Sequence, residues 1–554
     1  MVKMLRNHGS FSRSALALMV SFSACSGAST GGENTPGDLP GDEDPDVPVE
    51  TAGCKTNATF VRSPMRRLTA VEFDYAAADL FGEAGATGVE LLPSDEITAG
   101  YANNSVITLQ PNQVEKFQSA ARRIAEGTVT RVDKLVPCSG DKEKCALDFI
   151  DRVGRRAMRR PLETEESDLF AKMYRDKAKA TDHAQGIRLI VETMLQYPSF
   201  MYRPIVGVET AKDGVRKLTK WELAGRLSFF LWNSVPDDEL MESAEAGKLE
   251  TPSGIREQTE RMMQDDRFDR SLKAFSVQWF DVGAIAPDKN PADFPNFNQE
   301  VWGSMRDGLA QFFAHAVRNG GDMTTLMTGP FAFANKKTAT IYGVPAKSDT
   351  LELFDTNPAQ RGGLMTQAGV MAALGNTEVS RPIKRGLFVR NRLLCQDPPP
   401  PPPEGVPPFE AAGDNLTVRE MLEAHRADPT CASCHTFFDP PGLAFSHFDG
   451  VGQYHEMEKG KKVDASGTLI DTDVDGDFTN AIEFMNMLKD SSLVAACVSA
   501  QIFRFAIGRL EEDGDKCAQE ATVKQFADSQ QSLPGLFTSI ATSDSFRFTG
   551  SETP

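Results

Sequence analysis

The strongest chemical pattern in this sequence is a pair of cysteines followed directly by a histidine. Cys431, Cys434 and His435 form a C-x-x-C-H motif. Two thiols at this spacing bind the two vinyl groups of one haem, and the adjacent imidazole then binds the iron. The motif therefore predicts one covalent haem c. The alternatives are a redox disulfide, which leaves His435 unexplained, and a zinc site, which needs further ligands at a compatible spacing.

The sixth iron ligand decides whether such a haem carries electrons or catalyses a reaction. The candidates are His425, which precedes the motif, and the thioethers of Met457 and Met485, which follow it. The helix dipole alone favours a histidine at the end of a helix, so His425 could have this structural role and not bind the iron. Core packing is the simpler role for each methionine.

The residues that follow the motif are expected to surround the haem. Phe437, Phe438, Leu443 and Phe445 are predicted to form the wall at its edge. The D-P-P-G sequence at residues 439–442 predicts a turn that brings the chain over the haem.

An acidic segment at residues 471–477 imitates the start of a calcium loop. Asp471, Asp473 and Asp475 occupy positions 1, 3 and 5, and Gly476 occupies position 6. Position 12 should be glutamate but is Ile482. We therefore favour a solvated acidic turn over a calcium site.

Five arginines lie within residues 152–160 and could bind an anionic substrate. Their helical spacing and three glutamates within residues 163–166 favour an ion-paired face instead. The sequence has no glycine-rich phosphate loop, H-E-x-x-H zinc motif or G-x-S-x-G nucleophile motif.

The N-terminus predicts export. Basic residues precede an apolar run at residues 15–22, and Ser23 and Ala24 precede Cys25. This pattern is typical of a bacterial lipoprotein signal, with ordinary cleaved secretion or an uncleaved N-terminal tail as the alternatives. We expect lipidation of Cys25 and a lipid anchor in the cell envelope, at the outer membrane or the periplasmic face. The apolar run is too short to span a bilayer, so the anchor is the only expected membrane contact.

The net charge argues against nucleic acid as a partner. The 554 residues include 59 lysines and arginines and 78 aspartates and glutamates, which gives a formal charge of −19. Such a field repels phosphate backbones.

The nine cysteines predict disulfides, because spare thiols tend to pair in an oxidising compartment. Removing Cys25 and the two cysteines of the motif leaves an even number. The predicted pairs are Cys138 with Cys145, Cys497 with Cys517 and, as the remaining pair, Cys54 with Cys395.

The elements that must position the motif are predicted to be helices. A threonine followed three residues later by glutamate, ahead of an apolar periodic run, predicts a capping box and a helix start. This pattern occurs at Thr69 with Glu72, Thr219 with Glu222, and Thr417 with Glu420. Short hairpins are expected only at residues 331–343 and 462–473. The fold class is therefore mainly α, with a multi-domain helical body and few short strands.

Lapses in helical periodicity predict the domain boundaries. The clearest is the run of six prolines at residues 398–403, which favours a stiff extended spacer. The predicted segments are a signal peptide at 1–24, an acidic tether at 25–61, helical domains at 62–135, 146–206 and 217–344, a haem-binding domain at 357–456 and a C-terminal helical domain at 463–548.

Several segments together resemble one family. They include "RRLTAVEFDYAAADLFG", "LTKWELAGRLSFFLWNSVPDDEL", "RPIKRGLFVRNRLLCQDPPPPPP" and "HRADPTCASCHTFFDPPGLAFSHFDGVGQY". These segments are similar to those of the large cytochrome c-like proteins of planctomycetes and myxobacteria, over residues 62 to about 548. The resemblance implies a fixed series of mostly uncharacterised domains with a C-terminal cytochrome c-like module. It implies Cys431 and Cys434 as haem attachments and His435 as the proximal ligand, and it gives no substrate.

Three functions remain open at this stage. The first is electron transfer in the bacterial envelope, with a redox protein as partner. The second is a haem-dependent redox enzyme whose helical domains hold the substrate. The third is a surface scaffold or polymer-binding lipoprotein in which the haem is structural.

Overall fold

The computed structural model describes residues 60–82, 87–105, 108–210, 214–375, 382–398, 415–427 and 429–551. The predicted signal peptide, most of the predicted tether, Cys25, Cys54 and residues 399–403 of the proline run lie outside these ranges. Within them the chain is mainly helical with few short strands, as its sequence predicts.

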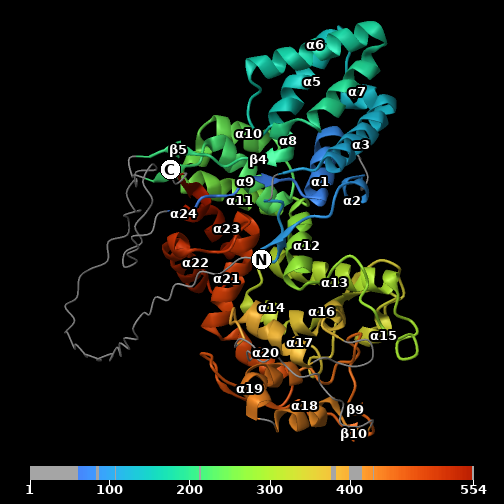
Figure 1. The fold of residues 1–554 in the computed structure, drawn as a ribbon, viewed down its shortest axis with the longest axis vertical. Coiled ribbons are helices and arrows are strands. Elements are labelled where there is room, and N and C mark those ends of the chain that lie inside the picture. The colour runs from blue at the N-terminus through green and yellow to red at the C-terminus, as the bar shows by residue number, and fades with distance from the viewer. Residues whose placement is uncertain are drawn as a thin grey trace, which may run out of the picture. The chain divides into compact units, whose positions relative to one another are not determined.

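The helices of the N-terminal part share one hydrophobic core, and α5, α6 and α7 pack side by side (Figure 1). Phe73 lies at its centre, with ring centroids 6.2 Å from Phe117 and 5.7 Å from Phe200. The helices are α1 (Ala70–Phe81), α2 (Thr87–Leu91), α3 (Pro111–Thr128), α4 (Val132–Leu135), α5 (Lys142–Ala157), α6 (Thr164–Ala180), α7 (His183–Met194) and α8 (Pro198–Met201), with the 3-10 turn η1 (Val129–Arg131).

The central helices begin at residue 220. They are α9 (Lys220–Trp232), α10 (Asp238–Glu245), α11 (Pro252–Gln264), α12 (Phe268–Trp279), α13 (Gln299–Arg318), α14 (Met323–Thr328), α15 (Ala339–Tyr342) and α16 (Ala368–Ala373), with the 3-10 turns η2 (Lys248–Glu250) and η3 (Leu364–Thr366).

The C-terminal helices carry the C-x-x-C-H motif. They are α17 (Pro382–Phe388), which continues into the π-helical turn η4 (Val389–Leu393), then α18 (Val418–Arg426), α19 (Pro429–Leu443), α20 (Ala481–Lys489), α21 (Ser492–Ile507), α22 (Lys516–Asp528), α23 (Leu533–Thr542) and α24 (Asp544–Arg547), with the 3-10 turn η5 (Asp513–Asp515).

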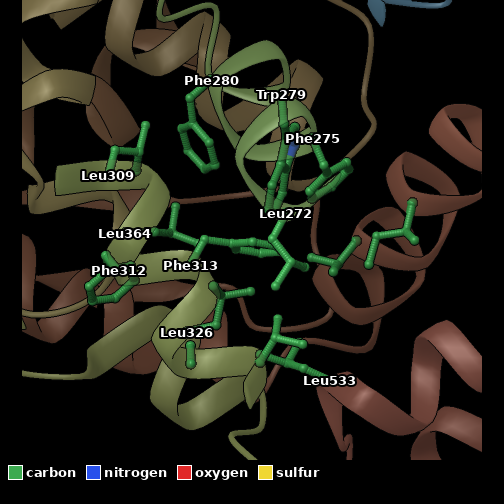
Figure 2. Close-up of a cluster of buried hydrophobic side chains, with 14 of the residues drawn as sticks. Leu272, Phe275, Trp279, Phe280, Leu309, Phe312, Phe313, Leu326, Leu364 and Leu533 are labelled. Atoms are coloured by element: carbon green, nitrogen blue, oxygen red, sulfur yellow. The ribbon is translucent and has the colours of Figure 1, made fainter. Parts of the chain in front are cut away.

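A second, larger core joins the central helices to the C-terminal ones. In its middle, the ring centroid of Phe275 lies 5.2 Å from those of both Trp279 and Phe313. Figure 2 shows this cluster with Leu326, Leu364 and Leu533 around it. Because residues from α12 to α23 share this core, the central and C-terminal helices bury their apolar faces together.

The three predicted capping boxes are confirmed. At the start of α1, the backbone N–H of Glu72 donates to Thr69 Oγ1 at 3.2 Å, and the N–H of Thr69 donates to the Glu72 carboxylate at 2.8 Å. Gly82, at φ 84°, ends this helix. The same reciprocal bonds start α9 at Thr219 with Glu222 and α18 at Thr417 with Glu420.

The described strands are short and pair antiparallel. The predicted hairpins at 331–343 and 462–473 are only partly right, because the strands Phe331–Ala334 and Gly467–Leu469 pair with strands beyond those stretches. The strands are β1 (Arg66–Arg67) with β4 (Tyr202–Arg203), β2 (Ile97–Thr98) with β3 (Tyr101–Ala102), β5 (Val208–Glu209) with β6 (Val215–Lys217) and β13 (Phe548–Gly550), β7 (Phe331–Ala334) with β8 (Glu352–Asp355), β9 (Met457–Glu458) with β10 (Lys461–Lys462), and β11 (Gly467–Leu469) with β12 (Gly476–Phe478).

One predicted disulfide is confirmed and two are wrong. Cys138 and Cys145 are bonded, as expected for cysteines that bracket a short loop. Cys497 is bonded to Cys395, with the two Cα atoms 5.4 Å apart. This bond excludes both the predicted pair of Cys497 with Cys517 and the predicted pair of Cys54 with Cys395. Cys517 is disulfide-bonded as well.

Helix geometry explains why Cys497 does not pair with Cys517. Cys497 lies about ten residues before the last residue of α21, which is a rise of about 15 Å along the helix. Cys517 stands at the start of α22, beyond the far end of α21. The side of α21 that carries Cys497 packs instead against η4, which places it beside Cys395.

Among the described residues, no single helix has the length and hydropathy needed to cross a membrane. The pair Ala481–Leu488 and Ser492–Ile507 meets these criteria together but is bent by 77°. Its residues Phe484, Met485 and Val498 are fully buried in the larger core.

Candidate functional site

The C-x-x-C-H motif lies in the first half of α19. Cys431 and Cys434 are three positions apart, so they share one face of this helix. Both are half-buried and neither is in a disulfide, whereas the other cysteines that the structure describes are all disulfide-bonded. The alternative interpretation of the motif, a disulfide between Cys431 and Cys434, is therefore not formed here.

His435 is held by a buried carboxylate one turn further along the same helix. Its Nδ1 atom lies 3.0 and 3.1 Å from the two carboxylate oxygens of Asp439. His435 is buried and Asp439 has no exposed surface. A carboxylate at Nδ1 accepts the proton of that nitrogen, which leaves the Nε2 lone pair to bind a metal.

A guanidinium group from α18 also faces this carboxylate. Arg426 Nε lies 3.7 Å from Asp439 Oδ2, an oxygen that His435 Nδ1 also approaches at 3.1 Å. Burial raises the pKa of Asp439, and His435 and Arg426 oppose that rise. The carboxylate is thus a shared acceptor that ties α18 to α19.

Aromatic contacts complete the surroundings of His435. The ring centroid of His425 lies 4.6 Å from that of His435, with the two planes at 74°. The ring of Phe438 lies 4.9 Å away. Two imidazoles that bind one iron from opposite faces need the iron and the porphyrin plane between them. In the structure, by contrast, the His425 ring lies directly against the His435 ring, where it orients that ring.

Helix α17 fixes the second half of α19, and the two helices lie side by side (Figure 1). A Cβ atom on Gly386 would overlap the carbonyl of Phe438, and one on Gly442 would overlap the carbonyl of Pro382. Only glycine permits this close backbone contact.

The predicted turn at residues 439–442 is wrong, because these residues are helical. Proline lacks the N–H that would reach the carbonyl four residues earlier, so Pro441 leaves the carbonyl of Phe437 without its helical donor. Arg390 Nε donates to that carbonyl at 3.0 Å. The Arg390 guanidinium also stacks over the Phe437 ring, 4.0 Å from its centroid.

The predicted haem wall is placed in three different surroundings. Phe437 packs under Arg390, and Phe445 packs against Phe484, with ring centroids 5.9 Å apart. Leu443 is fully buried. Phe438 is the wall residue that contacts the His435 ring.

The candidates for the sixth ligand are also separated. Met457 is 56% exposed on β9, and Met485 is fully buried in the larger core on α20. His425 is the candidate that the structure brings against His435.

A second pair of histidines forms a loop contact after α19. His455 Nε2 lies 3.0 Å from Asp449 Oδ2, and the His447 ring stacks on Tyr454 with centroids 4.9 Å apart. The hydrogen bond to Asp449 raises the pKa of His455. These residues stabilise the loop.

The acidic segment at residues 471–477 uses its carboxylates as structural acceptors. Asp473 accepts hydrogen bonds from the backbone N–H and the hydroxyl of Ser492 at the start of α21. Asp475 accepts from the N–H of Thr472 at 2.7 Å. Within the described ranges, no group of three His, Cys, Asp or Glu side chains is arranged to hold a metal ion.

Three of the five arginines of residues 152–160, namely Arg155, Arg156 and Arg160, form ion pairs, as favoured above. Arg155 lies 3.0 Å from Glu245, and Arg160 binds both oxygens of Glu166 at 2.7 and 2.9 Å. Arg159 is different, because it is buried and donates to backbone carbonyls only, at Ala157, Ser199, Phe200 and Tyr202.

Sequence reasoning missed the partners of His435. Asp439 follows His435 by four positions, which is the spacing of neighbours on one helix face, but the two prolines after Asp439 indicated a turn. Arg426 carried no signal, because its contact depends on how α18 packs against α19.

The described set of donors fits a covalent haem. It consists of two thiols outside any disulfide on one helix face and a buried imidazole with Nδ1 bound to a carboxylate. Thioether formation needs the two thiols, and iron ligation through Nε2 needs the imidazole whose Nδ1 is bound by the carboxylate.

Comparison with known families gives matches to domains only. No curated protein and no solved structure matches this chain. The domain models that match are all described as proteins of unknown function: DUF1587 at residues 66–130, DUF1595 at 145–204, DUF1592 at 218–344, DUF1588 at 361–458 and DUF1585 at 475–546. The chain is therefore a tandem, multi-domain series whose five parts are similar to five domain families of unknown function.

Proposed function

We propose that this chain is an exported c-type haem protein that transfers electrons in the bacterial cell envelope. Cys431 and Cys434 hold the haem through thioether bonds, and His435 is the proximal iron ligand. The observation that carries the proposal is the pairing of two thiols that are not in a disulfide with an imidazole whose Nδ1 is bound by buried Asp439.

Each residue of the site has a defined task in this proposal. When bound, the haem supplies an iron that gains and loses one electron. Asp439 keeps the proton of His435 on Nδ1, so that Nε2 faces the metal, and it makes the imidazole a stronger donor. Arg426 and His425 hold Asp439 and His435 in place. Helix α17 and η4 anchor α19 through the close contact of Gly386 with the α19 backbone and through Arg390, so the motif sits on a rigid element.

Export is supported by the disulfides. Cys138 with Cys145 and Cys395 with Cys497 are bonded, and such bonds persist in oxidising compartments. We propose that the mature chain begins at a lipidated Cys25 and that the haem-binding module comprises residues 357–456.

A haem-dependent redox enzyme is the second candidate, and one observation favours it. A carboxylate bound directly to the proximal imidazole increases electron donation to the iron, which stabilises its oxidised states. His425 beside His435 adds a group that can hold a proton near the metal.

Optical spectroscopy of the exported protein tests the proposal. The full chain is produced with cytochrome c maturation machinery, and the pyridine haemochrome spectrum and the intact mass are recorded. We expect one haem per chain that survives denaturation. The C431A/C434A variant should carry no covalent haem, while the C138A/C145A variant, which loses an unrelated cysteine pair, should carry it in full. Absence of covalent haem from the wild-type protein would refute the central claim.

Carbon monoxide distinguishes electron transfer from catalysis. A low-spin reduced spectrum that carbon monoxide does not change means two protein ligands and supports electron transfer. A high-spin or readily ligated iron means an open site and supports the redox enzyme. In either case, D439N should raise the reduction potential. A neutral amide accepts a weaker hydrogen bond from the Nδ1–H group of His435 than a carboxylate does, so the imidazole donates less electron density to the iron and stabilises its oxidised state less.

A further inference from the structure

A cavity of about 360 Å³ lies between the start of α9, the end of α5 and the segment that follows α8. Its volume is within the range of small-molecule sites. Met158, Ile205, Val206 and Trp221 give it an apolar lining. Guanidinium groups provide its charge, and the arginines concerned are Arg66, Arg159, Arg160, Arg203 and Arg226.

The carboxylates near this cavity do not balance its arginines. Glu166 pairs with Arg160 at 2.7 Å, and Glu72 pairs with Arg203 at 2.9 Å. The one lining carboxylate, Glu222, accepts hydrogen bonds from the backbone N–H groups of Val206 at 2.6 Å and Gly207 at 3.1 Å. The five arginines thus outnumber the three carboxylates Glu72, Glu166 and Glu222, and the cavity keeps an excess of positive charge.

Arg159 and Arg226 hold this excess charge inside the protein. Arg226 donates to the carbonyl of Phe546 at 2.8 Å and to the hydroxyl of Ser63 at 2.6 Å. Both arginines are more than nine-tenths buried, and their hydrogen bonds go to uncharged oxygens. Burial lowers the pKa of each to about 9, because the attraction of Glu72 for Arg159 and of Glu222 for Arg226 offsets the loss of solvation only in part.

Two donors around the cavity are also unused. The Nε atoms of Arg203 and Arg226 are buried, and neither has a hydrogen-bond partner among the described residues. Two buried N–H groups without an acceptor are costly, and they add to the positive potential of the wall around the cavity.

We propose that this cavity binds a small organic carboxylate with an apolar body. The carboxylate supplies the missing negative charge and accepts from arginine N–H groups, for which its two oxygens are well suited. The apolar body packs against Ile205, Val206 and Trp221. This site is separate from the C-x-x-C-H motif, and its function does not depend on haem.

Fluorescence of Trp221 reports binding. Trp221 is half-buried in the cavity wall, whereas Trp232, Trp279 and Trp302 are fully buried elsewhere. The full chain is titrated with benzoate and hexanoate, with the neutral amides benzamide and hexanamide as isosteric controls and with inorganic phosphate. We expect a saturable change for the two carboxylates and none for the amides or for phosphate.

Two variants assign the binding to this cavity. R226Q should weaken carboxylate binding about 10-fold to 100-fold, which is the effect of one charge-assisted hydrogen bond. V206F should block the entrance, because Val206 is 58% exposed at the rim and the larger side chain needs no space in the core. V208F is the matched control, since Val208 is 51% exposed on β5 and does not line the cavity.

The outcomes separate clearly. Carboxylate binding that V206F abolishes and V208F preserves supports the proposal, even if R226Q fails to fold. Equal binding of acids and amides, selective binding of phosphate, binding that V206F leaves unchanged, or no binding of either carboxylate would overturn it.

Discussion

Removing the disulfide between Cys395 and Cys497 should destabilise the protein more than removing the one between Cys138 and Cys145. The first closes a loop with a sequence separation of 102, and the second closes one with a separation of 7. The chain-entropy relation gives about 4.7 kcal/mol for the long loop and about 2.4 kcal/mol for the short one. The free energy of unfolding should therefore fall by about 2 kcal/mol more in C395A/C497A than in C138A/C145A.

A tryptophan close to the long crosslink provides the assay. Trp279 Nε1 donates to the carbonyl of Arg392 at 3.1 Å, in the segment that leads to Cys395. Urea unfolding followed by tryptophan fluorescence and by circular dichroism gives the midpoint and slope for each double variant, and an unchanged slope allows the free energies to be compared. Both variants should still carry their other disulfides, which intact mass after alkylation verifies.

One result would refute this reasoning. If C395A/C497A loses no more free energy than C138A/C145A, then the long loop does not restrict the unfolded chain as the entropy relation requires. A changed slope in C395A/C497A alone would instead mean that the segment around η4 separates from α21 before the rest of the protein unfolds.

Three further predictions concern the surroundings of the motif. G442A should lower the free energy of unfolding by about 1 to 3 kcal/mol, because its Cβ overlaps the backbone of α17, whereas G303A, in open space on α13, should be neutral or stabilising; equal urea midpoints for the two would contradict this. Asp449 raises the pKa of His455, so their pair contributes stability fully below pH of about 6.5 and loses it as pH rises through the raised value. D449N should therefore move the NMR titration of His455 down towards about 6.5, and an unchanged titration would refute the assignment. R385K should lower the free energy of unfolding by about 2 kcal/mol or more, because an ammonium group cannot replace the 2.8 Å bonds from this fully buried guanidinium to three backbone carbonyls; a thermal midpoint equal to wild type would show that these bonds are dispensable.

Capping boxes and short-range disulfides could be predicted from the sequence, because both partners of each interaction lie within a few residues of one another. Thr69 with Glu72 starts α1 as expected, since both partners of a capping box lie in the same turn. The disulfide of Cys138 with Cys145 is local in the same sense.

Long-range contacts could not be predicted from the sequence. The bond between Cys395 and Cys497 depends on the packing of α21 against η4, and the spacing of the cysteines carries no sign of it. The arginine-lined cavity has the same origin, because Arg66, Arg159 and Arg226 come from separate segments that meet only in the folded chain.

The prolines of α19 show how a local rule fails for a physical reason. A pair of prolines normally ends a helix, because each removes a backbone donor. Here Arg390 replaces the lost donor at the carbonyl of Phe437, so the helix continues to Leu443. The continuation places Asp439 one helical turn after His435 with its side chain buried, where it binds Nδ1. The tautomer of His435 therefore depends on an arginine of η4, and the two thiols, the imidazole and its carboxylate share one helix.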